Sequence, residues 1–361
     1  MIAAAVSCQK DNLGKVSEGE TPEEVIDYSD DPMQIIKVRI PKSTSRLSLV
    51  DEDGILKRTF SEDDEGQQLI GCTKVTDESD GHFEPFAYDI LEVRESNSYV
   101  DIILKKAKGK QGIPSNKKGT IVNFIYAPGH QCENITSEGV LPLDLSNQEK
   151  DIIPTVMFAQ GTVEEDNSVS LAFSNVAAAL EIVDYTMADE TTPVDFDSFG
   201  SITVDAFTKG DLKVTDTGFE LEECQQGKAT VTGYDGKEPV FVAVLPGTGK
   251  IKASFNDVAK GEEKIGKFEW ATSSDIEVSG GNDFKRIREK AFEFVPVAKI
   301  GETKYGYLAK AVAAALASGA PASITILEDC SITGAMPSIV GENKITLDLN
   351  GKVITETADA V

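Results

Sequence analysis

The stretch from Gly119 to Tyr126, GTIVNFIY, is the clearest strand in the sequence, and Ala127-Pro128-Gly129 ends it with a turn. Similar short runs occur along the chain, among them Ser98–Leu104 (SYVDIIL), Ser168–Phe173 (SVSLAF) and Pro239–Pro246 (PVFVAVLP). Gly, Asp, Asn and Thr turns separate them, and almost no helical periodicity occurs before residue 300. Strands at this spacing predict a mainly β fold built of antiparallel β-sandwiches.

The length of 361 residues exceeds one ordinary domain, so we expect several units. Residues 1–32 are acidic and poor in apolar side chains, which predicts an extended tether. Residues 33–150 and 151–298 are expected to form two tandem sandwiches. Residues 299–361 have a different pattern from the rest of the chain. That pattern predicts a small module that combines one helix with further strands.

Within that last module, residues 304–318 have the spacing of an amphipathic helix. Leu308, Val312 and Leu316 recur on one face, and Gly319 follows as a stop. Strands are expected over 323–327 and 344–354, and Asn350-Gly351 predicts a turn within the second stretch.

Composition restricts the function. The net charge of −26 and the sequence pI of about 4.5 argue against nucleic-acid binding, because an acidic surface repels phosphates. No run of about 18 apolar residues occurs, so no membrane-spanning helix is expected. We predict no metal and no cofactor, since the cysteines form no CxxC pair and only two histidines, His82 and His130, are present. The state of the internal cysteines stays open between a Cys72–Cys132 bridge and free thiols; the five cysteines are Cys8, Cys72, Cys132, Cys224 and Cys330.

The beginning of the sequence resembles a bacterial lipobox. Small residues, Ala5-Val6-Ser7, lead directly into Cys8. The resemblance implies a signal peptide cut before Cys8, lipid attached to that cysteine and a place on the outer membrane at the cell surface. Gln9-Lys10-Asp11 resembles a short signal that sends lipoproteins to the cell exterior. Because a secretory signal also needs an apolar region of about 7–15 residues, we expect the sequence to lack part of its start.

Segments in the first 298 residues together resemble the fimbrillin-like family, the β-sandwich lipoproteins that build and cap one class of bacterial pili. The resemblance covers about 33–298 and implies transthyretin-like sandwiches. The family usually continues its first segment with a Trp and a Gly-Asp pair, where this chain has Thr59–Asp64. The similar segments are 40–54, 153–159, 169–173, 179–183 and 240–247.

This resemblance implies a way of binding partners. In polymerising members a protease removes the first strand after a basic residue, and the vacated groove accepts a strand from a neighbour. Arg39 and Arg46 are the basic residues near the first strand, so either is a candidate processing site. The alternative, that both are sheet-face arginines and the strand stays in place, is equally open. Expected partners are other pilus subunits or surface proteins, or a host protein or glycan.

The tail has a separate likeness. Residues 298–315, 324–327 and 347–354 are similar to the opening of a right-handed parallel β-helix, which implies further coils beyond the sequence. A module at this end favours a pilus accessory or tip subunit, or a stand-alone adhesin, over a repeating stalk subunit. We expect no enzyme.

The alternative function is a polysaccharide-active or glycan-binding lipoprotein that works through the tail. Its candidate acids are Glu328, Asp329 and Asp348, although a role in supporting turns explains Asp348 better. Trp270, Tyr305 and Tyr307 leave sugar stacking open, and for Trp270 a place in the core is the simpler interpretation.

Overall fold

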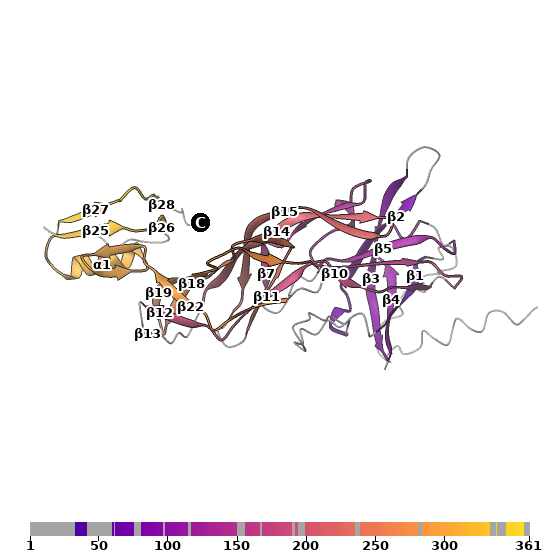
Figure 1. The fold of residues 1–361 in the computed structure, drawn as a ribbon, viewed down its shortest axis with the longest axis horizontal. Coiled ribbons are helices and arrows are strands. Elements are labelled where there is room, and N and C mark those ends of the chain that lie inside the picture. Colours follow the sequence, from indigo (N-terminus) through magenta and orange to yellow (C-terminus); the bar gives the residue numbers. More distant parts are fainter. Residues whose placement is uncertain are drawn as a thin grey trace, which may run out of the picture.

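The computed structural model is mainly β, with α1 (Leu308–Ala317) as the one α-helix of the described residues. Figure 1 shows the strands arranged along an elongated body, with β1 to β5 at one end and α1 with β25 to β28 at the other. The structure describes residues 33–41, 60, 62–75, 81–96, 98–114, 117–149, 156–166, 168–189, 192–193, 199–234, 239–280, 284–332, 337 and 344–356.

The first sheet has eight strands in the order β10-β8-β5-β2-β3-β4-β1-β9. It curls until its two ends meet, because Val163, just after β8, forms a bridge with Val169 in β9. The sheet therefore encloses a core of its own. Its strands are β1 (Ile35–Pro41), β2 (Gln68–Val75), β3 (His82–Glu95), β4 (Tyr99–Lys106), β5 (Ile121–Tyr126), β8 (Met157–Thr162), β9 (Ser168–Ser170) and β10 (Ser174–Asn175).

A second core lies between two facing sheets. A three-stranded sheet, β16-β11-β21, packs against a nine-stranded sheet that contains β14, β15, β18, β19 and β22. The strands are β11 (Ala178–Val183), β12 (Thr186–Asp189), β13 (Thr192–Pro193), β14 (Ser201–Thr215), β15 (Gly218–Thr232), β16 (Val240–Val244), β18 (Lys252–Lys260), β19 (Glu263–Ala271), β21 (Phe284–Arg288) and β22 (Ala291–Val295), with a small β17 (Gly247–Gly249) and β20 (Ile276–Val278) pair beside them.

The two strand sets interlock. β6 (Val140–Asp144) and β7 (Asn147–Glu149) pair with β14 and β15, whereas β8 to β10 pair within the first sheet. Pairing thus crosses the division expected at residue 150 in both directions, and that division itself stays a prediction.

A third apolar cluster joins the two strand sets. The tip of the β14–β15 hairpin reaches the first sheet, where Gln160 donates to the Thr215 carbonyl and the rings of Phe158 and Phe219 lie 5.0 Å apart. Ile70, Ile125 and Phe158 from the first sheet share this cluster with Leu212 and Val214 from the second. Because one continuous apolar cluster spans the junction, the hairpin fastens the two sets together.

The C-terminal module contains α1 and two stacked pairs of parallel strands. β25 (Ala322–Ile326) pairs with β27 (Ile345–Asp348), and β26 (Cys330–Ile332) pairs with β28 (Ile354–Glu356), both in parallel. β23 (Ala298–Ile300) lies on the other edge of β25 and pairs with β24 (Thr303–Tyr305). One face of α1 covers this group and forms a small core with Ile324 and Ile326.

The helix predicted over 304–318 is present over a shorter range. Residues 303–305 pair with β23 instead, and Gly319 ends the helix region with a φ of +65°. Asn350 and Gly351 form the predicted turn, both with positive φ. The flanking strands β27 and β28 do not pair with each other, because each pairs with a strand of the layer below.

Candidate functional site

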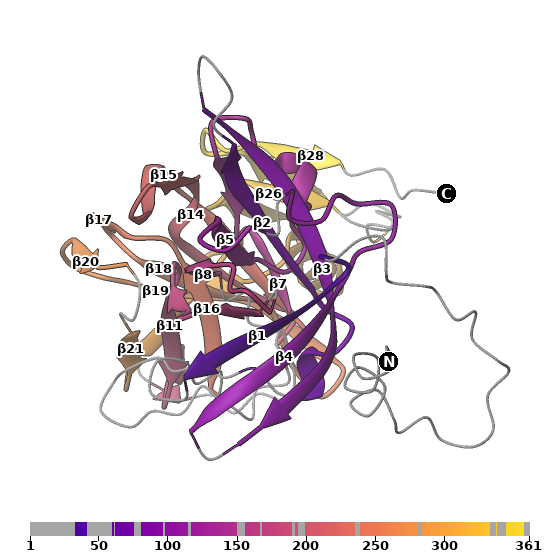
Figure 2. The same ribbon diagram turned by 90° about the vertical axis from the view of Figure 1, so that its right-hand side faces the viewer.

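The candidate site is β1, which closes the first sheet. β1 pairs antiparallel with β4 along its whole length, from Ile35 opposite Lys105 to Pro41 opposite Tyr99. On its other edge it pairs in parallel with β9, and the Leu171 amide donates to the Arg39 carbonyl at 3.0 Å. Figure 2 shows β1 lying beside β4 across the end of the molecule. β1 is therefore a strand held on both edges by segments distant from it in the chain.

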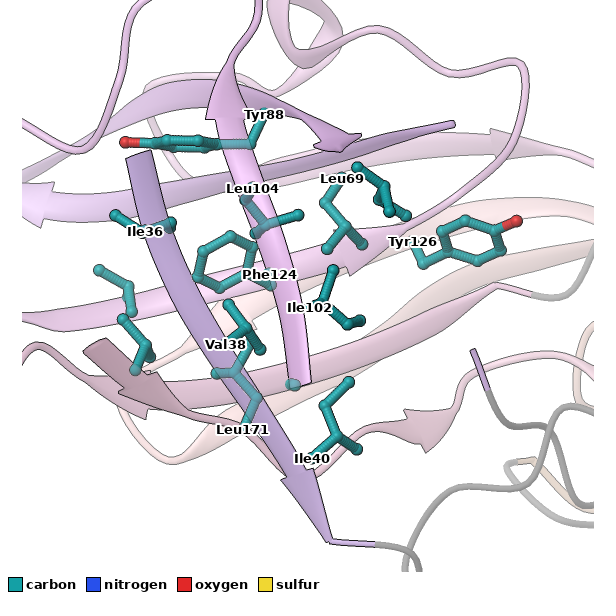
Figure 3. Close-up of a cluster of buried hydrophobic side chains, with 14 of the residues drawn as sticks. Ile36, Val38, Ile40, Leu69, Tyr88, Ile102, Leu104, Phe124, Tyr126 and Leu171 are labelled. Carbon is teal, nitrogen blue, oxygen red and sulfur yellow. The ribbon is translucent and has the colours of Figure 1, made fainter. Parts of the chain in front are cut away.

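One face of β1 fills the core of the sheet. Ile36, Val38 and Ile40 are 0–1 % exposed and alternate with exposed residues, as the two-residue period of a strand requires. Figure 3 shows these three side chains in one cluster with Ile102, Leu104, Phe124 and Leu171. Burial of three such side chains contributes about 5–8 kcal/mol of transfer free energy, taken as an upper estimate.

The other face of β1 carries its charges. Arg39 donates to both carboxylate oxygens of Asp101, at 2.8 and 3.0 Å, and Lys37 lies 2.8 Å from the same carboxylate. The Arg39 guanidinium also lies over the Tyr99 ring, 4.1 Å from its centroid. The hydrogen bonds from Arg39 hold the pKa of the Asp101 carboxyl below its ordinary value, although burial acts in the opposite sense. Asp101 thus fixes β1 to β4 through side chains as well as backbone.

This geometry defines a groove that depends on β1. Without β1, the facing edges of β4 and β9 would be unpaired, and the apolar side chains that contact Ile36, Val38 and Ile40 would form its floor. Another strand with the same alternation could occupy such a groove, because backbone hydrogen bonds supply affinity and alternate side chains supply specificity.

The predicted site residues fall in different places. Arg39 lies inside β1, with its backbone bonded to β9 and its side chain to Asp101, so peptide-bond cleavage there requires β1 to open first. Cys8 and Arg46 lie outside the described residues, as does the tether of residues 1–32. The sequence did not single out Asp101. A carboxylate inside an apolar strand, SYVDIIL, is the signal that could have found it.

The residues considered for catalysis or sugar binding have structural contacts. Asp348 accepts a hydrogen bond from the Asn350 amide, and Asp329 accepts one from the Val353 amide, so both carboxylates support turns. Trp270 packs against the second core near Phe292.

The tyrosine and histidine residues considered from the sequence also have local contacts. The Tyr307 hydroxyl donates to Asp257 at 2.8 Å. His82 lies 3.4 Å from Glu84, and the His130 ring contacts backbone groups of Pro128 and Asp144. Cys72, Cys132, Cys224 and Cys330 are free thiols, so the possible Cys72–Cys132 bridge is not formed.

A hollow of about 660 Å³ opens where the hairpin tip meets the first sheet. Phe83, Ile121, Asn123 and Gln160 are among the residues that line it. The side-chain amide of Asn123 donates to the Cys72 carbonyl and its oxygen accepts from Gln160, so the polar groups of its floor bind each other.

Among the described residues, no cluster of His, Cys, Asp and Glu side chains has the arrangement of a metal site. The same part of the chain contains no helix with the length and apolar character needed to span a membrane.

Comparisons with known proteins give matches at the level of structure. No family model matches the sequence, and no curated protein matches it either. A putative cell adhesion protein from Bacteroides uniformis aligns with a TM-score of 0.40 and 13 % identity over 67 % of this chain and 88 % of its own. A fimbrial assembly protein from Parabacteroides distasonis aligns with a TM-score of 0.33 and 11 % identity, over 70 % and 89 % of the two chains. A minor pilin from Streptococcus agalactiae aligns with a TM-score of 0.25 and 9 % identity, over 75 % and 100 %.

Proposed function

We propose that this protein is a structural and adhesive subunit of the cell surface, a pilus accessory or tip subunit or a stand-alone adhesin, that binds partners by strand addition. The observation that carries the proposal is β1 itself: a short alternating strand near the start of the chain fills a groove between β4 and β9. A strand from a neighbouring subunit with the same alternation would make the same backbone bonds. While β1 stays in place, the facing edges of β4 and β9 are paired, so a strand from a partner could not bind between them.

The exchange needs a cut that frees β1. Cleavage after Arg46 would leave β1 attached to nothing but the preceding residues, so that the whole strand could leave. Cleavage after Arg39 would divide β1 and requires prior opening. We therefore propose Arg46 as the processing site, because a cut there leaves β1 whole.

Limited trypsin digestion tests this mechanism. We expect the first cut between Arg39 and Arg58, followed by release of the fragment that contains β1. A synthetic peptide of residues 33–41 should then bind the cleaved protein in native mass spectrometry, whereas the same peptide with Val38→Asp should not. First cleavage around Lys105 to Lys118, or equal binding of both peptides, would contradict strand exchange.

We also propose that, before the cut that frees β1, lipid on Cys8 anchors the protein to the outer membrane, with residues 9–32 as the spacer. The small residues before Cys8 and the acidic stretch after it support this placement. Cys8→Ala should move the protein from the membrane fraction to the soluble fraction. Retention of the variant in the membrane fraction would exclude the lipid anchor and leave the strand-addition proposal untouched.

For the tail, we propose two coils of a parallel β-helix. The parallel pairing of β25 with β27 and of β26 with β28 supports it. In this arrangement the tail presents a surface at the end of the molecule opposite β1.

A further inference from the structure

The outer layer of the C-terminal module repeats the apolar pattern of the layer beneath it. β27 lies in register on β25, so that Ile345 lies beside Ala322 and Leu347 beside Ile324, and Leu349 follows two residues after Leu347 in the chain. Residues 345, 347 and 349 therefore lie on the face of the sheet that carries the buried side chains of β25.

The two layers differ in what covers them. Ile324 and Ile326 are 0 % exposed, whereas Leu347 is 43 % and Leu349 is 47 % exposed. Val353, which follows the Asn350-Gly351 turn, is 59 % exposed. Three of the five large exposed apolar side chains of the described residues thus lie within this one segment. They lie at the outer edge of the sheet, where no further strand of the described part of the chain pairs with β27. An edge strand with an uncovered apolar row is a template for another strand.

We propose that the outer edge of β27 binds β27 of a second copy of this chain, antiparallel, with Leu347 on the two-fold axis. A two-fold contact requires a surface that is complementary to itself. With Leu347 opposite Leu347, Ile345 faces the partner's Leu349, and Thr346 faces the partner's Asp348. Every apolar side chain of the row then meets an apolar one, and no like charges are opposed.

Neighbouring registers are less favourable. A shift of two residues in one direction opposes the two Asp348 carboxylates, and like charges directly opposite each other are destabilising. A shift in the other direction pairs Ile345 with Leu347 and leaves Leu349 beyond the paired strands. Only the register centred on Leu347 covers the whole apolar row without a charge conflict.

Long-range charge acts against this contact. Each chain carries a net charge of −26, so two copies repel each other, and added salt screens that repulsion. We therefore expect dimerisation to strengthen as the salt concentration rises, the opposite of an interface held by ion pairs.

Sedimentation equilibrium of the full chain over a concentration series tests the proposal, with Thr346 as the decisive position. Thr346→Lys places a lysine opposite the partner's Asp348 twice by symmetry, so the dimer should tighten about two- to thirtyfold. Thr346→Asp should weaken it by a similar factor. Leu347→Asp opposes two carboxylates on the axis and should abolish the dimer.

The matched control is Leu91→Asp. Leu91 lies on β3 and is 48 % exposed, close to the value for Leu347, so its substitution should leave the dimer unchanged. Far-ultraviolet circular dichroism verifies that each variant is folded. A wild-type chain that stays monomeric up to about 1 mM overturns the proposal. A dimer that Thr346→Lys weakens also overturns it, because that result requires the register in which the two Thr346 residues meet.

Discussion

β1 and β27 are similar strands in opposite surroundings. In β1, Ile36, Val38 and Ile40 alternate with Lys37 and Arg39, and β27 with its next residue repeats that alternation from Ile345 to Leu349. β1 has a strand on each edge, and its apolar side chains are 0–1 % exposed. Among the described residues β27 has a strand on one edge only, and Leu347 is 43 % exposed.

Two properties of an alternating strand are distinct: which side chains share a face of the sheet, and whether other strands cover that face. The alternation determines which side chains share a face of the sheet. Whether that face is covered depends on strands from elsewhere in the chain. β4 and β9 cover the edges of β1, whereas β25 is the one strand of the described segments that pairs with β27. The strands beside an alternating strand thus determine whether both of its edges are paired and whether its apolar face is buried.

The largest expected difference comes from a carboxylate placed in each row. Val38→Asp would bury an unpaired charge in the core of the first sheet, and we expect it to lower the free energy of unfolding by about 3–5 kcal/mol. Leu347→Asp, in dilute monomeric protein, should lower it by about 1 kcal/mol or less, because the new carboxylate reaches water. Urea unfolding monitored by circular dichroism measures both. Equal losses would show that the two rows are equally buried.

The next effect tests the charged face of β1. Asp101→Asn removes the carboxylate that binds Lys37 and Arg39, and it should lower the free energy of unfolding by about 1–3 kcal/mol at pH 7. The folded state lowers the pKa of Asp101, so its contribution is fully present above the unfolded pKa of about 4 and is lost as the pH falls through the folded pKa.

The pH series supplies the control for this prediction. The difference between the wild-type protein and Asp101→Asn should narrow below pH 4, and it should stay constant from pH 5 to 8. Asp348→Asn, at the exposed strand, should change stability by no more than about 0.5 kcal/mol. A difference that persists unchanged to pH 2 would mean that the carboxylate charge does not hold β1.

The sequence predicted the local structure of the chain better than it predicted which strands pair with each other. The strand around Gly119 to Tyr126, the helix that ends before Gly319 and the turn at Asn350-Gly351 follow from propensity and backbone conformation, and all are present. The strands on either side of the Asn350-Gly351 turn pair with the layer below and not with each other. A turn sequence determines a local change of direction, and long-range packing determines the partner.

The same reason limits the prediction of the candidate site. The alternation of β1 and the charge of Arg39 are visible in the sequence. The position of β1 between β4 and β9 depends on contacts between segments that are far apart in the sequence, and no local sequence pattern determines such contacts. Gly306 is a further example. A Cβ at this position would lie 2.1 Å from the Ile265 carbonyl oxygen, because β19 and the start of the C-terminal module approach each other closely there. That approach is visible only in the folded structure.

Thiol reactivity provides a third comparison between the two ends. Burial raises the pKa of Cys72 to about 12. Burial also raises the pKa of Cys330 at the C-terminal module, but that residue is only half-buried. Because the thiolate is the reacting form, iodoacetamide at pH 8 should modify Cys330 at least about tenfold faster than Cys72. Peptide mass spectrometry after short labelling times measures the ratio. Similar rates would indicate that the first sheet opens as readily as the tail.

The smallest expected effect concerns the attachment of the C-terminal module. Tyr307→Phe removes the hydrogen bond to Asp257 and should lower the local stability of α1 by about 0.5–1.5 kcal/mol. Hydrogen exchange of the α1 amides measures this loss directly. Tyr305→Phe is the matched control, since no hydrogen bond of its hydroxyl is found within the described residues and its ring packs on the module's own core. If both variants exchange alike, the Tyr307–Asp257 bond does not hold the module. If only Tyr307→Phe exchanges faster, the module bearing the open edge of β27 is held to the second strand set by a specific contact, in contrast to the shared apolar cluster that joins the first two strand sets.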